Sequence, residues 1–306
     1  MATEAVSASA VERDARRGTG LLAIDRVAIA YAALTGSLSL AGGPKGAAFA
    51  GLHVLVIFLI VMMSRRPLPR GQLATFFRLL YPVIATPLLY HELSYLNQFV
   101  VTGFFDPIVQ RWEVAVFGSQ ISQEAAGWFP ALWLSEFMTI GYLTYYFVIP
   151  LLAIGAWASA GKAGFHRLGV TVALAFAVCY TWFILFPVMG PRYWYGALEG
   201  ALSEGSIYQF TRDLLAGGSS KGTAFPSSHV AGTCAAWFAA AREDERGFYL
   251  AAFPVVILTL STFWVGFHYA IDAAAGLVIA WIAFAVAPRL TAWAPLPDDS
   301  SAPDAP

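Results

Sequence analysis

The chain of 306 residues is 58% hydrophobic and only 12% charged, with a net charge of −1. A soluble globular domain carries about 25% charged residues, so this composition excludes an ordinary soluble protein. It also excludes disorder over most of the length, which needs low hydrophobicity, and a nucleic-acid-binding protein, which needs a surplus of basic residues. Cys179 and Cys234 lie in apolar runs and predict neither a disulfide framework nor a zinc cluster.

The two ends of the chain differ from the rest. Residues 1–20 are small, polar and charged, and we expect them to form a disordered cytoplasmic tail. The other end, PLPDDSSAPDAP, is rich in Pro, Asp, Ser and Ala and cannot bury enough apolar surface to offset chain entropy. We therefore expect a second disordered tail over residues 289–306.

Long apolar runs fill the sequence between these tails. A helix needs roughly 20 apolar residues to cross a hydrocarbon core of about 30 Å. The first run is the least typical because it contains Asp25 and Arg26. The sequence therefore predicts an all-α, polytopic membrane bundle, with two accessory transmembrane helices over residues 21–73 and a six-helix core over residues 74–288. The eight runs are residues 22–41, 47–63, 74–95, 137–158, 167–187, 226–241, 248–266 and 268–288.

Charge and aromatic residues predict the orientation. The segments DPIVQRWEVAVFG and WFPALWLSEF are amphipathic and aromatic, which is typical of a membrane interface. If the N-terminus is cytoplasmic, most of the 18 Lys and Arg fall on the same side as both termini. We expect a bacterial inner-membrane protein whose loop 188–225 is extracytoplasmic. The few cations on that outer side are Lys45, Arg111, Arg192, Arg212 and Lys221.

Two histidines are placed to meet at the outer face. His229 begins the sixth run, and His268 begins the eighth. The sixth helix descends from His229 and the seventh returns to the depth at which it began. Asp272 follows His268 by four residues, so the two side chains share one helical face. A carboxylate there can accept the imidazole N–H, which fixes the tautomer and leaves the other ring nitrogen nucleophilic.

The segment KGTAFPSSH adds the start of a helix. Pro226 suits the first helical position, and Ser227 and Ser228 follow with backbone N–H groups that have no partner within the helix. Such a helix start binds anions, phosphate above all. Together with Arg192 and Lys221, it predicts an outer anion pocket that holds two histidines and one carboxylate. The chemistry that fits this pocket is phosphoryl transfer through a histidine intermediate.

These motifs resemble the type-2 phosphatidic acid phosphatase superfamily. Pro226, Ser227, Ser228 and His229 look like its second motif, and Ser261, His268 and Asp272 look like its third. Thr262 stands where the family has an arginine, and Leu185 stands where its first motif has a lysine. The segments HYAIDAAAG and GPRYW are closer to the branch of inositol phosphorylceramide synthase and sphingomyelin synthase, which also loses much of the basic set.

The resemblance implies a role for each residue. His268 attacks phosphorus, Asp272 orients it, and His229 protonates the leaving oxygen. Arg192, Ser227 and Ser228, with Lys221 as a weaker candidate, hold the phosphoryl oxygens, and no metal or other cofactor is needed. We expect a lipid phosphatase or phosphotransferase whose partners are a phosphorylated lipid and the bilayer.

Other interpretations remain open. A headgroup transferase of the inositol phosphorylceramide synthase type uses the same residues, and a non-catalytic lipid transporter or lipid-binding relative could use its histidines without chemistry. A lone membrane histidine is more often a packing residue, which we expect for His53. His91 and Glu92 either line a headgroup pocket or lie at the interface, and we favour the interface. The many aromatic residues are expected to form an interfacial belt.

Overall fold

The computed structural model describes residues 20–69, 71–294 and 296. The predicted tails lie outside the described residues over positions 1–19 and 297–306, but residues 289–293 continue the last helix. Within the described part of the chain all regular structure is helical, apart from one isolated bridge between Val188 and Thr223. The prediction of an all-α bundle is confirmed.

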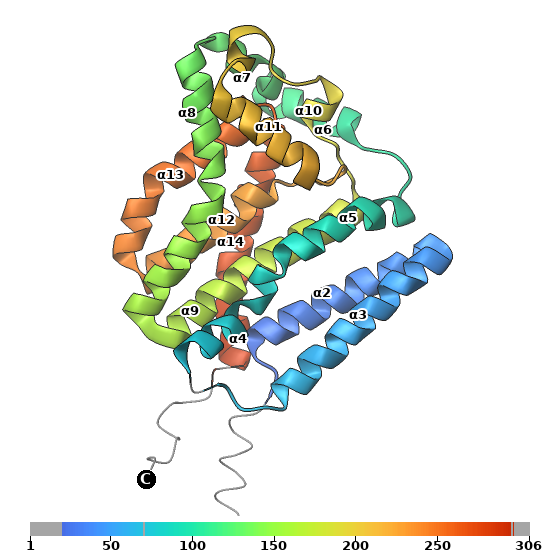
Figure 1. The fold of residues 1–306 in the computed structure, drawn as a ribbon, viewed down its shortest axis with the longest axis vertical. Helices are drawn as coiled ribbons and strands as arrows, with labels where there is room; N and C mark the ends of the chain where they lie inside the picture. Colours follow the sequence, from blue (N-terminus) through green and yellow to red (C-terminus); the bar gives the residue numbers. More distant parts are fainter. Residues whose placement is uncertain (1–19, 70, 295, 297–306) are drawn as a thin grey trace, which may run out of the picture.

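Five helical segments among the described residues are long and apolar enough to cross a membrane. Two of them contain a turn, at η1 (Leu40–Gly42) in the first and at Gly161 in the third, where the glycine has a φ of 61° and Figure 1 shows the chain reversing direction. The two turns divide the five segments into seven helical spans, which hold most of seven predicted runs. The eighth run, residues 226–241, lies in α12 (Ser228–Glu243), which is not among the five segments. The five segments are Ala23–Ser64, Gln72–Val100, Tyr145–Leu185, Glu245–Trp264 and Ala270–Trp293.

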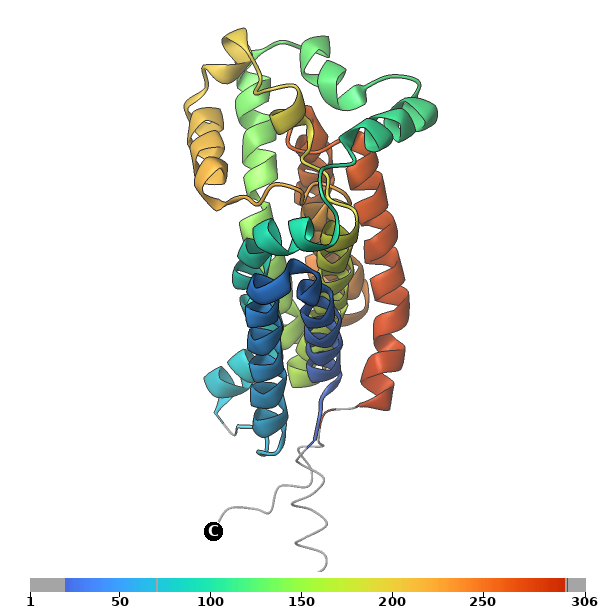
Figure 2. The same ribbon diagram turned by 90° about the vertical axis from the view of Figure 1, so that its right-hand side faces the viewer.

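The N-terminal pair of helices forms a hairpin on the side of the bundle. Helices α2 (Ala23–Ser39) and α3 (Gly43–Ser64) run side by side (Figures 1 and 2). Asp25, the residue that made the first run untypical, is fully buried and accepts two hydrogen bonds from Arg78, at 2.7 and 2.8 Å. Arg78 lies on α4 (Gln72–Ile84), so this ion pair joins the hairpin to the core.

The core is packed around α12 (Ser228–Glu243), which contacts α9 (Tyr145–Leu185) and α14 (Ala270–Trp293). Small residues allow the close approach. A Cβ atom on Gly276 would come within 2.6 Å of the Ser227 carbonyl oxygen, so only glycine lets α14 pass the start of α12. The remaining long helices are α5 (Thr86–Val100), α8 (Leu132–Leu143) and α13 (Glu245–Trp264).

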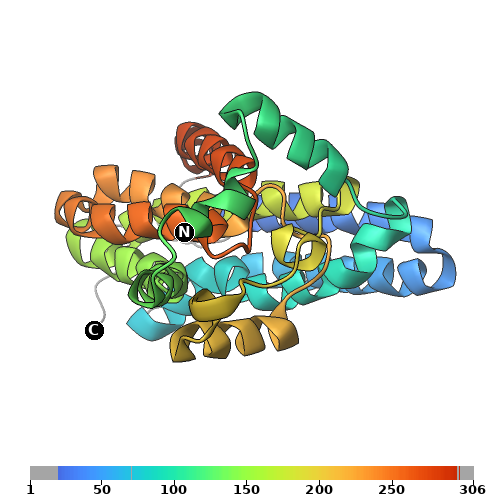
Figure 3. The same cartoon turned by 90° about the horizontal axis from the view of Figure 1, so that it is seen from above.

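Short helices cover one end of the bundle (Figures 2 and 3). The expected loop 188–225 contains several of them, because its apolar side chains, Tyr208 and Leu215 among them, are buried against the bundle. Trp128 and Trp133 remain more than half exposed on this end, as expected at an interface. The covering helices are α6 (Asp106–Phe117), α7 (Ile121–Trp128), α10 (Pro191–Trp194), η2 (Gly200–Ser203) and α11 (Ser206–Gly218).

The opposite end holds cations in ordered contacts. Arg167 pairs with Glu243 at 2.6 Å, and the Arg26 guanidinium lies 4.0 Å from the centre of the Trp293 ring. The two ends of the bundle therefore differ: one is covered by aromatic short helices, and the other is rich in arginine.

Candidate active site

The start of α12 brings one histidine into the bundle. The helix begins at Ser228 rather than at Pro226, because the Ser227 side chain accepts a hydrogen bond from the Val230 N–H and caps the helix. His229 is therefore the second helical residue. The backbone N–H groups of this first turn have no carbonyl acceptor within the helix.

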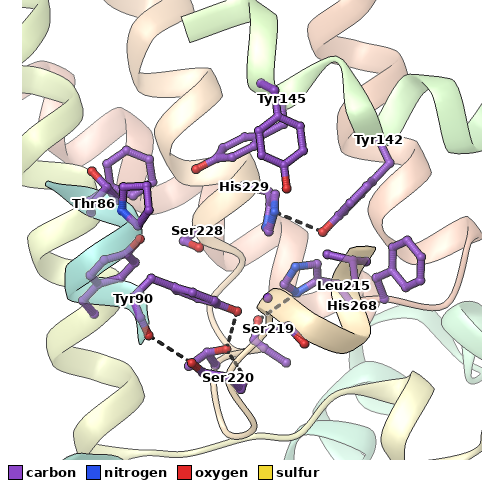
Figure 4. Close-up of a pocket in the computed structure, with 18 of the residues that line it drawn as sticks. Thr86, Tyr90, Tyr142, Tyr145, Leu215, Ser219, Ser220, Ser228, His229 and His268 are labelled. Atoms are coloured by element: carbon purple, nitrogen blue, oxygen red, sulfur yellow. Dashed lines mark hydrogen bonds between the residues drawn. The ribbon is translucent and has the colours of Figure 1, made fainter. Parts of the chain in front are cut away.

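The turn between α13 and α14 brings in the second histidine. The Thr262 carbonyl accepts hydrogen bonds from the N–H groups of Phe267 and His268, at 3.2 and 2.9 Å, which closes the turn. The centres of the His268 and His229 rings are 5.5 Å apart. The two histidines, 39 positions apart in sequence, thus lie side by side (Figure 4).

The His268 ring is held in one tautomer by a main-chain group. Its Nδ1 lies 2.9 Å from the Ala224 carbonyl oxygen and 3.4 Å from Asp272 Oδ2. The carbonyl can only accept, so Nδ1 carries the proton and Nε2 keeps its lone pair. Burial lowers the pKa of His268 to about 4, opposed by the bond to Ala224 and reinforced by Arg192. The imidazole is therefore neutral at neutral pH.

Asp272 caps a helix, a role that the sequence did not predict. Its Oδ2 accepts the Tyr269 N–H at 2.8 Å and so caps α14, while its Oδ1 has no hydrogen-bond partner. Its main-chain carbonyl accepts the Ser227 N–H at 3.0 Å, which joins the starts of α12 and α14. The carboxylate is fully buried beside His268, but the closer partner of the imidazole is Ala224.

Tyrosines surround His229, and sequence reasoning missed them. The Tyr142 hydroxyl lies 3.0 Å from His229 Nε2, and the Tyr145 ring centre lies 4.4 Å from that of the histidine. His229 Nδ1 is buried without a partner. The available signal was the three-residue spacing of the two tyrosines in GYLTYYF, but interfacial tyrosines show the same spacing.

Both histidines line a cavity of about 380 Å³, which we call the histidine-pair cavity (Figure 4). Arg192 is the one Arg or Lys among its described lining residues, and its guanidinium donates hydrogen bonds to the hydroxyls of Tyr193 and Ser219. Part of the wall is apolar. The polar lining includes Ser219, Ser220 and Ser228, and the apolar lining includes Val83, Ile149, Phe176 and Leu215.

Two of the predicted phosphate-binding residues lie outside this cavity. Ser227 is fully buried, and its N–H and hydroxyl are used in the contacts that join and cap the helices. Lys221 is exposed, and its Nζ lies 5.5 Å from the Tyr193 ring centre. Leu185 and Thr262 do not line the cavity either. Arg192 and Ser228 remain as the predicted anion contacts.

A buried carboxylate anchors the segment that carries Arg192. Asp106 on α6 accepts hydrogen bonds from the N–H groups of Met189 and Gly190, each at 2.9 Å, and from the Tyr269 hydroxyl at 3.0 Å. Gly190 has a φ of 92°, which favours glycine, and a Cβ there would meet the Ala224 methyl at 3.0 Å. The cover of short helices thus fixes the backbone next to Arg192.

Metal ligands are not gathered at this site. Among residues 20–69, 71–294 and 296, no group of three or more His, Cys, Asp or Glu side chains is placed to hold a metal ion. The charged and polar groups around the cavity are those of an anion site: a guanidinium, hydroxyls and helix-start N–H groups.

Comparison with known proteins identifies the family. The model of the PAP2 superfamily matches residues 110–286, which is more than half of the chain and includes both histidines and Asp272. Comparisons with curated proteins and with solved structures give no match. Members of this superfamily are typically phosphatases, which agrees with the anion site described above. The chain belongs to the PAP2 superfamily.

Proposed function

We propose that this protein cleaves a phosphate ester of a lipid through a covalent phosphohistidine at His268, without a metal ion. One observation carries this proposal: a neutral imidazole, with its Nδ1–H given to the Ala224 carbonyl, lines a cavity that also contains a guanidinium. A histidine in that state has the lone pair on Nε2 that nucleophilic attack requires.

The first step would transfer the phosphoryl group to the enzyme. His268 Nε2 attacks phosphorus, the bond from phosphorus to the ester oxygen breaks, and its electron pair goes to that oxygen. His229, whose Nε2 lies 3.0 Å from the Tyr142 hydroxyl, must enter this step protonated, and it supplies the proton that this oxygen needs.

The second step would release the phosphoryl group. The oxygen of water or of an alcohol attacks phosphorus and gives its proton to His229. The bond between phosphorus and Nε2 breaks, which returns the lone pair to His268. The same pair of histidines therefore serves both steps.

Three kinds of donor would bind the phosphoryl oxygens. Arg192 supplies a charged guanidinium that can form two parallel hydrogen bonds. The N–H groups of Ser228 and His229 at the start of α12 supply backbone donors, and Ser219 supplies a hydroxyl. These donors act where negative charge develops in the transition state.

The lipid nature and the membrane face of the substrate are part of the same proposal. Apolar side chains such as Ile149 and Phe176 form one wall of the cavity, and five segments of the chain are able to cross a membrane. The end of the bundle that carries the cavity is poor in Lys and Arg, which supports an extracytoplasmic position. We accordingly propose a bacterial inner-membrane enzyme with both termini in the cytoplasm.

A second candidate is a headgroup transferase of the inositol phosphorylceramide synthase type. The observation that favours it is the thin set of cations: Arg192 alone among the described lining residues carries a positive charge, and Thr262 and Leu185 stand where the family has cations. With fewer charges, the site suits a phosphodiester, which has one negative charge, better than a phosphomonoester, which has about two.

The test uses purified full-length protein in nanodiscs with a chelator present. Lipid phosphates and intact phospholipids are supplied with water alone, with a polyol, or with a lipid alcohol, and His268→Ala is measured beside the wild type. We expect chelator-resistant turnover that the variant loses, and an acid-labile phosphoenzyme in the wild type only.

The outcomes separate the candidates. Phosphate released with water alone identifies a phosphatase, whereas product formed only with an added alcohol identifies a transferase. Unchanged turnover in His268→Ala, at an unchanged thermal unfolding midpoint, would disprove the phosphohistidine mechanism.

A further inference from the structure

A second cavity lies between the N-terminal hairpin and the core. It measures about 490 Å³, and we call it the hairpin cavity. Its walls come from α2, α3, α4, α5 and α9, and they are almost entirely apolar. Leu52, Leu88 and Tyr95 on its walls are at least half exposed, so the cavity opens sideways to the surroundings of the bundle. In a membrane those surroundings are hydrocarbon.

Three polar atoms on this apolar wall form no ordinary hydrogen bond: the hydroxyl of Tyr31, and Nε2 of His53 and Oε1 of Glu92, which form a long ion pair with each other at 3.4 Å. Tyr31 and His53 are 6% and 5% exposed. Tyr31, His53 and Glu92 belong to three different helices, α2, α3 and α5. Buried polar groups are nearly always hydrogen-bonded, so a hydroxyl without a partner and a long ion pair on one cavity wall indicate a polar ligand group at this cluster.

The geometry of Tyr31, His53 and Glu92, which we call the polar cluster, limits the kind of ligand that can bind there. His53 Nδ1 lies 2.8 Å from the Phe49 carbonyl, so Nδ1 donates and Nε2 faces Glu92 Oε1 at 3.4 Å, longer than an ordinary hydrogen bond. The Glu92 carboxylate would repel a phosphate or a fatty-acid carboxylate. A hydroxyl suits the three atoms because it can donate to Glu92 or His53 and accept from Tyr31.

Helix α5 separates this cavity from the histidine-pair cavity. Tyr90 lines the histidine-pair cavity, and Glu92, two residues later and thus about 200° around the helix, lines the hairpin cavity. The two cavities share the wall residues Thr86, Phe176 and Tyr180. The second cavity is therefore a distinct site next to the first.

We propose that the hairpin cavity binds a neutral long-chain lipid alcohol, with its hydroxyl between Tyr31, His53 and Glu92 and its hydrocarbon chain along the apolar walls. The volume lies within the range of about 300–1,000 Å³ that is usual for ligand pockets. This site goes beyond the proposed reaction and does not depend on it, since none of the three residues lines the histidine-pair cavity.

The test is photo-cross-linking of the full-length protein in nanodiscs. The probe is a long-chain primary alcohol with a diazirine in its chain, and the labelled peptides are identified by mass spectrometry. We expect labelling on α2, α3 and α5. Unlabelled alcohol should compete about tenfold better than its methyl ether or than the fatty acid of the same length, because only the alcohol makes the full set of hydrogen bonds.

Isosteric variants test the polar cluster. We expect Tyr31→Phe and Glu92→Gln each to reduce the preference for the alcohol over its methyl ether by about tenfold. Tyr249→Phe is the matched control, because Tyr249 is 68% exposed on α13 and lies outside the cavity. Ala28→Phe adds bulk to the wall and should abolish labelling of α2 and α3.

The proposal fails if the ether or the fatty acid competes as well as the alcohol, if labelling lies outside the three helices, or if the isosteric variants behave like the control. The His268→Ala variant separates this site from the reaction. It should keep full labelling while it loses turnover, and loss of both would refute the independence of the two sites.

Discussion

The two faces of α5 border cavities of opposite character. On one side, the histidine-pair cavity contains a guanidinium, serine hydroxyls and a helix start, all of which bind anions. On the other side, the hairpin cavity contains a carboxylate and no Arg or Lys among its described lining residues. Histidines occur in both, so histidine alone does not identify the reactive site. The charge that surrounds each histidine distinguishes them.

The partners of the histidines differ in the same way. The Nδ1 atoms of His268 and His53 both donate to main-chain carbonyls, at 2.9 and 2.8 Å. The free nitrogen of His268 shares its cavity with Arg192, whereas that of His53 faces Glu92. The proposed nucleophile needs a nearby group that attracts phosphate, and of these two histidines His268 has one.

The largest expected effect is that of His268→Ala. Loss of the nucleophile should lower turnover by at least about 10⁴-fold, because the residues of a covalent mechanism act as a unit. Turnover of the chosen lipid substrate and phosphoenzyme formation are measured together. The distinction between the two cavities would be wrong if His53→Ala caused the same loss of turnover at an unchanged thermal unfolding midpoint.

The ion pair between Asp25 and Arg78 should control stability rather than chemistry. Asp25→Ala leaves a guanidinium that is 9% exposed without its partner, which should cost about 3–5 kcal/mol of folding free energy. Thermal unfolding in detergent measures this loss. The double variant Asp25→Leu/Arg78→Met should recover most of it, because no unpaired charge remains. Failure of the double variant to recover stability would contradict this explanation.

Arg192→Gln should lower kcat by about 10²–10³-fold, the usual effect of removing one donor that stabilises a transition state. The matched control is Arg212→Gln, because Arg212 is exposed and pairs with Asp213 on α11. We expect the control to retain wild-type kinetics. A change confined to KM would instead mean that Arg192 binds the ground state and the transition state equally.

Tyr142→Phe should have a smaller effect. The variant removes the hydroxyl that lies 3.0 Å from His229 Nε2 but keeps the ring, so we expect about a tenfold loss of kcat. Substrates with a more acidic leaving group need less protonation and should recover the rate. An equal loss with both kinds of substrate would show that the hydroxyl does not act through proton transfer.

The smallest expected effect is the change of folding stability with pH. Because burial lowers the pKa of His268 to about 4 from its ordinary value of 6.5, the folded protein keeps this imidazole neutral through that interval. The unfolded chain binds a proton there, so His268 contributes a loss of stability as the pH falls from 6.5 towards 4. NMR titration of ¹⁵N-labelled histidine, with His268→Ala to assign the signal, measures the value. A midpoint near 6.5 would contradict the described burial.

Sequence patterns predicted the membrane bundle because their signals are local. The length of an apolar run and the periodicity of a helix depend on neighbouring residues, and all eight predicted runs lie mostly in helices. Local spacing also placed Ser227 and His229 at the start of one helix. The prediction that His268 and Asp272 share a helix was wrong, because α14 begins at Ala270 and His268 lies in the turn before it. The PAP2 superfamily match over residues 110–286 includes the starts of both of these helices.

Other features depend on contacts that no local pattern encodes. The acceptor for His268 Nδ1 is a carbonyl 44 positions away, and any residue type supplies a carbonyl, so Ala224 carries no signal in the sequence. The partner of Asp25 is 53 positions away, and a charge in an apolar run indicates only that some partner exists. Tyr142 resembles an interfacial tyrosine in the sequence, and only the fold brings its hydroxyl to His229.

The sequence by itself determined the membrane class, the helices, the family and the pair of histidines, because each follows from composition or short-range spacing. Only the tertiary structure decided which nitrogen of His268 is free, that Lys221 and Ser227 lie outside the cavity, and that α5 separates two cavities. The physical reason is that cavities and hydrogen-bond partners arise where helices distant in sequence pack together. Many sequences with the same apolar runs could pack in other ways.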